Sequence, residues 1–110
     1  MSRLNDLQTN DFHLACRTST PIALAFCISG NAWARKGDLD RAIEDYDTVL
    51  IMQPALTEVL VNRGNAWVGK GNFDRAIEDY DAALRINPKD EKAARNRALA
   101  LKLKSGSNPH

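Results

Sequence analysis

The sequence predicts an all-α fold made of stacked antiparallel helix pairs, an α-solenoid. Three observations support this prediction. A 34-residue unit occurs twice, apolar residues recur at helical spacing within each unit, and no stretch alternates apolar and polar residues as a half-buried strand does. The chain has 110 residues, which is room for one domain.

The duplicated unit is clearest in residues 30–47, GNAWARKGDLDRAIEDYD, and residues 64–81, GNAWVGKGNFDRAIEDYD. Aligning residues 23–56 with residues 57–90 gives 16 identities at 34 positions. An active site is seldom duplicated within one small chain, whereas a stacked scaffold is built from repeated units. We therefore expect one helix pair in residues 23–56 and a second in residues 57–90.

Each unit reads as two helices separated by a glycine. In the second unit, Leu60 and Trp67 have helical spacing, and Gly71 is suited to end the first helix in a left-handed conformation. Asn72, like Asp38 in the first unit, is a good N-cap for the next helix. That helix carries an apolar stripe at steps of three and four: Phe73, Ala76, Ile77, Tyr80, Ala83 and Leu84. Pro88 then closes the unit.

Gly30 and Gly64 lie inside predicted helices, where glycine costs about 1 kcal/mol relative to alanine. This cost suggests that a neighbouring helix approaches closely at these positions. Ala42 and Ala76 on the second helices suit the same contact.

These residues resemble the tetratricopeptide repeat, a 34-residue helical hairpin with the pattern W-x2-L-G-x2-Y…A-x3-F…P. The first unit has Phe26, Gly30, Trp33, Ala42, Tyr46 and Pro54, and the second has Leu60, Gly64, Trp67, Ala76, Tyr80 and Pro88. The leucine position departs from the pattern, with Ser29 and Arg63. The resemblance implies a right-handed superhelical stack.

The register continues beyond the two units. Residues 91–104 resemble the first helix of a third unit and are expected to cap the stack, followed by a disordered tail in residues 105–110. The basic residues within residues 91–104 are expected to keep the outer side of this helix soluble. Residues 1–21 are expected to hold a degenerate helix, residues 5–17, and a linker. In that helix Phe12 and Ala15 match the second helix of a unit, whereas Gln8 replaces a small residue.

The resemblance also implies a function, because in this family the first helices line a concave groove that binds an extended peptide or a partner helix. The expected groove residues are Cys27, Ile28, Asn31, Val61, Asn62, Asn65, Lys92, Arg95, Asn96 and Leu99. Asparagine can bond a peptide backbone, and the two cations can meet a carboxylate. One subset of the family clamps the carboxylate tails of chaperones, but Cys27 and Asn96 stand where that clamp has cations.

The leading hypothesis is a non-enzymatic protein–protein interaction module with a protein or peptide partner. The alternative is a structural self-assembly unit, a homo-oligomer formed through the ends of the array or by helix exchange. No residues combine a nucleophile, a base and oxyanion donors, and no cofactor is expected. The carboxylates of DRAIEDYD are expected on a solvated helix face, and GNAWARKGD lacks phosphate-loop spacing.

Composition restricts the other classes of partner. The net charge of +1 gives no field that attracts nucleic acid or a membrane surface. The apolar run of residues 21–28 is too short to span a bilayer, and it falls within the repeat rather than in a signal peptide. Cys16 and Cys27 make a poor disulfide framework, and reduced thiols explain them equally well. With only His13 nearby, no metal site is expected, and the default location is cytoplasmic.

Overall fold

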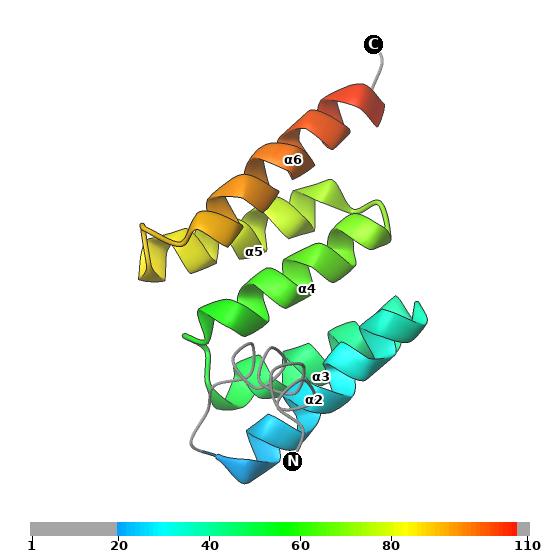
Figure 1. The fold of residues 1–110 in the computed structure, drawn as a ribbon, viewed down its shortest axis with the longest axis vertical. Coiled ribbons are helices and arrows are strands. Elements are labelled where there is room, and N and C mark those ends of the chain that lie inside the picture. The colour runs from blue at the N-terminus through cyan, green and yellow to red at the C-terminus, as the bar shows by residue number, and fades with distance from the viewer. Residues whose placement is uncertain (1–19, 108–110) are drawn as a thin grey trace, which may run out of the picture.

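The computed structural model describes residues 20–107. Five helices follow one another in this range (Figure 1): α2 (Pro21–Lys36), α3 (Leu39–Met52), α4 (Thr57–Gly69), α5 (Phe73–Ile86) and α6 (Glu91–Ser107). Residues 20–107 contain no strand, so the predicted all-α fold is confirmed. The helix expected in residues 5–17 lies outside the described residues.

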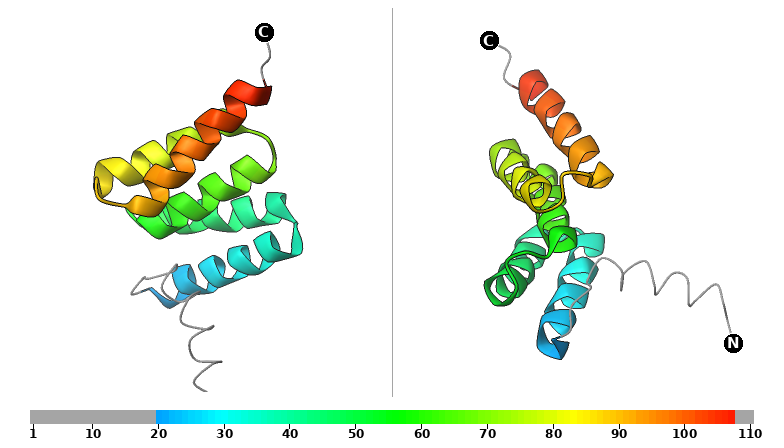
Figure 2. Two further views of the ribbon diagram at one scale, coloured as in Figure 1. Left: turned by 45° about the horizontal axis from the view of Figure 1, so that its top comes forward. Right: turned by 90° about the vertical axis from the view of Figure 1, so that its left-hand side faces the viewer.

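The helices form one stack in chain order. Helix α2 packs closely on α3, α4 packs closely on α5, and the junction between the two pairs is made by α3 and α4. Helix α6 packs on α5 as the first helix of a third unit would. Helices α2 and α6 lie at opposite ends of the stack in each view (Figures 1 and 2), and they do not contact each other.

The turn inside each pair follows the predicted capping residues. Gly37 and Gly71 have φ angles of 88° and 82°, the left-handed region that glycine adopts without strain. Asp38 and Asn72 cap the second helices, because each side chain accepts a hydrogen bond of 3.2 Å from the backbone N–H three residues later. The two pairs therefore turn in the same way.

A tyrosine ring explains the glycines inside the first helices. A Cβ atom added at Gly30 would lie 2.8 Å from Cε1 of Tyr46, and one added at Gly64 would lie 2.6 Å from Cε1 of Tyr80. Both tyrosines are almost completely buried. The predicted close approach is thus confirmed, and its cause is the aromatic side chain of the partner helix.

Small residues complete the core between the helices. Ala42 and Ala76 are fully buried on the second helices, as expected. Helix α6 adds Ala93 and Ala100, which are fully buried. These alanines let α6 pack closely on the preceding pair.

Helix α6 differs from its prediction in two ways. It continues to Ser107, so the expected tail from residue 105 is wrong for residues 105–107. Lys104 in its last turn suits the negative end of the helix dipole. Arg97 and Lys104 do not serve only to keep an outer side soluble, because they form ion pairs with Asp81 and Asp74 of α5.

Candidate binding surface

The first helices α2, α4 and α6 line one side of the stack. Helix α4 contacts both α2 and α6, whereas α3 and α5 do not contact each other. The stack is therefore tighter on the side of the first helices. We call this side the inner face.

The structure exposes most of the residues predicted for a groove and buries the others. Ile28, Asn65, Lys92, Arg95 and Leu99 are exposed, and Asn62 and Asn96 are partly exposed. The remaining three, Cys27, Asn31 and Val61, are buried. Because buried side chains offer little contact area, these three act in packing or in positioning their neighbours, which the sequence pattern alone does not reveal.

A hydrogen-bond chain runs along the inner face from one unit to the next. Oδ1 of Asn31 accepts from the hydroxyl of Tyr46 at 2.5 Å and from Nδ2 of Asn62 at 3.1 Å. The same arrangement recurs 34 residues later, where Oδ1 of Asn65 accepts from Tyr80 at 2.5 Å and from Asn96 at 3.0 Å. Each central asparagine thus links its own second helix to the next first helix.

These hydrogen bonds determine which amide oxygens of the inner face already have a partner. The carbonyl oxygens of Asn31 and Asn65 are already used as acceptors. The carbonyl oxygens of Asn62 and Asn96 have no hydrogen-bond partner among residues 20–107, because these side chains only donate through Nδ2. The inner face therefore presents one available amide acceptor at each step.

The tyrosines of this chain hold their protons. Burial raises the pKa of Tyr80 to about 12, and the charge of Asp79 adds to the effect. Burial raises the pKa of Tyr46 further, with a smaller contribution from Asp45. Both hydroxyls are hydrogen-bond donors near neutral pH and have no acid–base role there.

A set of ion pairs behind the inner face was missed by sequence reasoning. Arg63 bridges the two pairs of helices: Nη1 is 2.8 Å from Oδ1 of Asp47 in α3, while Nε and Nη2 lie 2.9 and 2.7 Å from the carboxylate of Asp79 in α5. Arg97 is placed in the same way, and its Nε is 2.5 Å from Oδ1 of Asp81. In the second unit, Arg63 at the leucine position of the repeat pattern thus forms ion pairs in place of an apolar contact.

Lysines form a second repeated pair at the other end of each junction. Lys70 pairs with Asp40, and Lys104 pairs with Asp74 at 2.6 Å. The carboxylates of DRAIEDYD thus do not all lie on a solvated face. Asp79 is only 5% exposed, and the other paired acids lie at junctions between units. The common 34-residue spacing of cations and acids was the sequence signal for these pairs.

Asp79 shows the effect of burial on such an acid. Burial raises the pKa of its carboxyl group, and the hydrogen bonds and charge of Arg63 act in the opposite direction. The same hydrogen bonds raise the pKa of Arg63. The ion pair thus offsets part of the cost of burying the carboxylate, and the pKa of Asp79 stays raised because burial has the larger effect.

The first unit lacks this compensation. Ser29 occupies the position of Arg63, and Asp45 occupies that of Asp79. Oδ2 of Asp45 is buried and has no hydrogen-bond partner in the described range. The acid at this position is therefore paired with an arginine in the second unit only.

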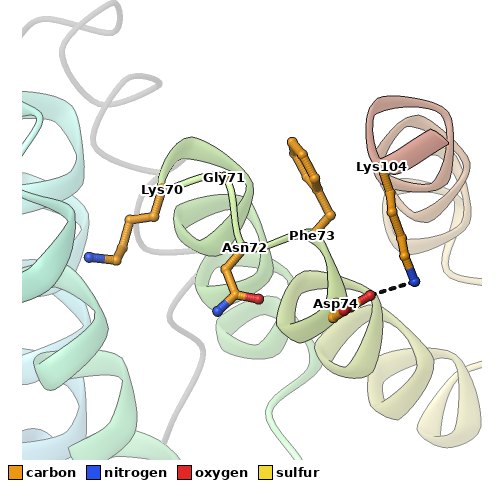
Figure 3. Close-up of a pocket in the computed structure, with 6 residues that line it drawn as sticks. All are labelled: Lys70, Gly71, Asn72, Phe73, Asp74 and Lys104. Carbon is orange, nitrogen blue, oxygen red and sulfur yellow. Dashed lines mark ion pairs between the residues drawn. The ribbon is translucent and has the colours of Figure 1, made fainter. Parts of the chain in front are cut away.

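A shallow pocket lies beside the turn between α4 and α5 (Figure 3). It is lined by Lys70, Gly71, Asn72, Phe73, Asp74 and Lys104, and the Lys104–Asp74 ion pair crosses it. Lys70 extends away from the pocket, toward its partner Asp40 in α3. The equivalent hollow one unit earlier is lined by Lys36, Gly37, Asp38, Leu39, Asp40 and Lys70. A hollow that recurs with the repeat is a feature of the stacking rather than a specific site.

Metal binding and membrane insertion are two further functions that the described helices bear on. Within residues 20–107, no three His, Cys, Asp or Glu side chains come together in an arrangement that could hold a metal ion. The helices in this range are too short or too polar to cross a bilayer. Cys27 is fully buried and is not a free thiol, whereas Cys16 and His13 lie outside the described residues.

The fold and the inner face together define a helical-repeat protein. A family model of the tetratricopeptide repeat matches residues 30–100, more than half of the chain. The chain belongs to the tetratricopeptide repeat family. A comparison with curated proteins gave no match. Proteins of this family are generally non-enzymatic scaffolds and protein–protein interaction modules.

Proposed function

We propose that the chain is a non-enzymatic adaptor that binds an extended acidic peptide on its inner face. The observation that supports this most directly is that α6 carries two exposed cations, Lys92 and Arg95, while the carbonyl oxygens of Asn62 and Asn96 on the same set of first helices stay available. The carbonyls can accept from the backbone N–H groups of a peptide. The cations can pair with its carboxylates. The cytoplasmic location expected from the sequence is part of this proposal.

Apolar side chains extend the same surface. Ile28 on α2 and Leu99 on α6 are exposed, with 40% and 52% of their surface accessible. A peptide that lies across the three first helices therefore meets apolar surface at its two ends and acceptors near its centre. We expect its affinity to decrease as salt is added, because the cations are exposed.

The test is selection of random peptides on immobilised protein, followed by affinity measurements at two salt concentrations. We expect the selected peptides to be enriched in Asp and Glu. The double variant Lys92→Ala, Arg95→Ala should bind them at least tenfold more weakly. Asn31 is left unchanged in this test, because it is buried and supports the hydrogen-bond chain.

A matched control removes two cations away from the inner face. Arg85 and Lys89 are exposed near the end of α5 and in the following turn. The variant Arg85→Ala, Lys89→Ala has the same net charge as the inner-face variant and should bind normally. Equal losses in both variants, or selected peptides without an excess of acids, would contradict the proposal.

A second candidate function is structural self-assembly. It is supported by apolar side chains left exposed at both ends of the stack. Ile22 and Phe26 are exposed on α2, and Leu101 is exposed on α6. Burying such side chains against another copy is favourable. Sedimentation of the chain over a wide concentration range distinguishes this candidate from a monomeric adaptor.

A further inference from the structure

Arg97 on α6 bonds one carboxylate, whereas Arg63 on α4 bonds two. Arg63 bonds one acid of the preceding unit, Asp47, and one acid of its own second helix, Asp79. Arg97 bonds the corresponding acid of the preceding unit, Asp81. Among residues 20–107, no helix supplies a carboxylate in the second position.

The surface of α6 around Arg97 is also uncovered. Ala94, Ala98 and Leu101 correspond, 34 residues on, to Leu60, Gly64 and Trp67. In α4, which packs on α5, Leu60 and Gly64 are buried and Trp67 is half-buried. In α6 all three equivalents are exposed, Leu101 by 41%. This stripe has the place and spacing of a surface that a second helix covers.

The pattern of the two complete units states what that second helix should carry. In each unit an acid is followed directly by an aromatic residue: Asp45 with Tyr46, and Asp79 with Tyr80. In the second unit the acid bonds the arginine, and in both units the tyrosine packs on the glycine and donates to an asparagine. At the third position Leu99 replaces that asparagine. An aromatic ring without a hydroxyl group therefore suits α6 better, because Leu99 cannot accept a hydrogen bond.

The chain itself contains such a pair. An acid directly precedes an aromatic residue at three places in the sequence, and the third is Asp11 with Phe12, 34 residues before Asp45 and Tyr46. Ala15 likewise stands at the position of Ala83, which is fully buried in α5.

This segment can reach the end of the stack only from another copy. Two residues, 18 and 19, separate residues 5–17 from Thr20, so residue 17 lies within about 10 Å of the start of α2, and a helix from residue 17 back to Asp11 adds about 9 Å. Helix α6 does not contact α2, and α4 lies between them. With helix axes about 8–10 Å apart, the far side of α6 is beyond that reach.

We infer that residues 5–17 of a second copy cover α6, with Asp11 bonding Arg97 and Phe12 packing on Ala98. This inference rests on the self-assembly candidate and names its interface. The contact is head-to-tail, since α6 of one copy meets the N-terminal segment of the next, and it leaves both ends of a pair able to add further copies. Charge supports this over a contact between two α6 helices, whose exposed Lys92, Arg95 and Lys102 would repel each other.

The test uses two single variants of the full chain, each of which blocks one side of the interface. Asp11→Arg places like charges together at Arg97, and Leu101→Glu puts a charge on the apolar stripe of α6. We expect the wild type to sediment as multi-chain species and each variant as the 12.2 kDa monomer. An equimolar mixture of the two variants should form a species of two chains and no larger, because each variant retains one intact side.

Ile86→Glu is the matched control for the α6 variant. Ile86 is also an exposed aliphatic residue, 47% accessible, but it lies at the end of α5. This control should assemble as the wild type does. Circular dichroism checks the helicity of each variant, and Ala98→Glu replaces Leu101→Glu if the latter is less helical.

The outcomes separate the inference from the candidate function. A wild type that stays monomeric at several hundred micromolar overturns both self-assembly and this interface. A wild type that assembles while both variants still assemble leaves self-assembly in place and refutes the interface. A mixture of monomeric variants that forms no two-chain species refutes the head-to-tail arrangement.

Discussion

Arg63 is the single residue on which the junction between the two complete units most depends. Its guanidinium group bonds one carboxylate in α3 and another in α5, and the second of these, on Asp79, is nearly buried. A buried carboxylate without its partner destabilises the fold, because it has lost its hydration and no ion pair replaces it. A leucine at this position restores the repeat pattern but removes that partner.

We therefore predict that Arg63→Leu lowers the free energy of unfolding by about 3 kcal/mol at neutral pH. Burial raises the pKa of Asp79, and without Arg63 nothing opposes this rise. A carboxyl group whose pKa is higher in the folded state stabilises less as the pH increases through that range. The loss should thus be larger at pH 7 than at pH 4, as measured by urea unfolding at both values.

Arg97→Leu is the control for this prediction. Its partner Asp81 is 40% exposed at the side chain, so water can solvate the carboxylate when the arginine is absent. Its loss should be below about 1 kcal/mol. A similar effect of both variants would mean that burial of Asp79 does not set the cost.

At the scale of the helix, the contact between glycine and tyrosine fixes how closely the members of a pair approach. Gly64 leaves no room for a Cβ atom, since Tyr80 would lie 2.6 Å away. Gly106 in α6 is helical too, but nothing lies within 4 Å of its added Cβ. The two positions differ in packing, and Gly106 lies in the last turn of its helix, where alanine is preferred over glycine less strongly than inside α4.

We predict opposite effects of alanine at these two glycines. Gly64→Ala should lower the melting temperature, because overpacking costs about 1–3 kcal/mol. Gly106→Ala should leave it unchanged or raise it slightly, since alanine is the better helix former. Thermal unfolding followed by circular dichroism compares them directly. A stabilised Gly64→Ala would show that the tyrosine can move away at little cost.

At the scale of the whole molecule, the units are not equally tied to their neighbours. The second unit has the complete set of Arg63 contacts and is covered on both sides by α3 and α6. The first unit has Ser29 in place of the arginine, and Oδ2 of Asp45 has no partner within the described range. In a linear array, stability is a sum of unit and junction contributions.

We predict that amide hydrogen exchange is slowest in α4 and α5 and faster in α2 and α3. The missing arginine contacts weaken the first unit, and local opening reflects local stability. Exchange measured by NMR or mass spectrometry on the dilute monomer gives this order for each helix. Equal protection in both units would show that the arginine contacts do not govern local opening.

The sequence predicted the helices, turns and inner core, because each depends on residues close together in the chain or on the repeat itself. Gly71 and Asn72 indicated the turn, and Gly64 indicated a close contact. The binding surface was less predictable. Burial of Asn31 and Val61 depends on how neighbouring helices pack. The acids of the second helices were interpreted as solvated because their cations lie on another helix, for Asp79 in the same unit and for the other paired acids in the next unit. The groove as a ligand site stays a prediction.

The junction contacts have a consequence for how such an array can grow. In residues 57–90, Arg63 and Lys70 form ion pairs with acids of the preceding unit. Asp74 and Asp81 of the same unit form ion pairs with cations of the following helix, α6. This unit is therefore compatible with a copy of itself. The first unit is not, because Ser29 cannot take the place of Arg63. Gene duplication or protein design could lengthen the chain by inserting further copies of residues 57–90. At every new junction, the cations of one copy would face the acids of the copy before it.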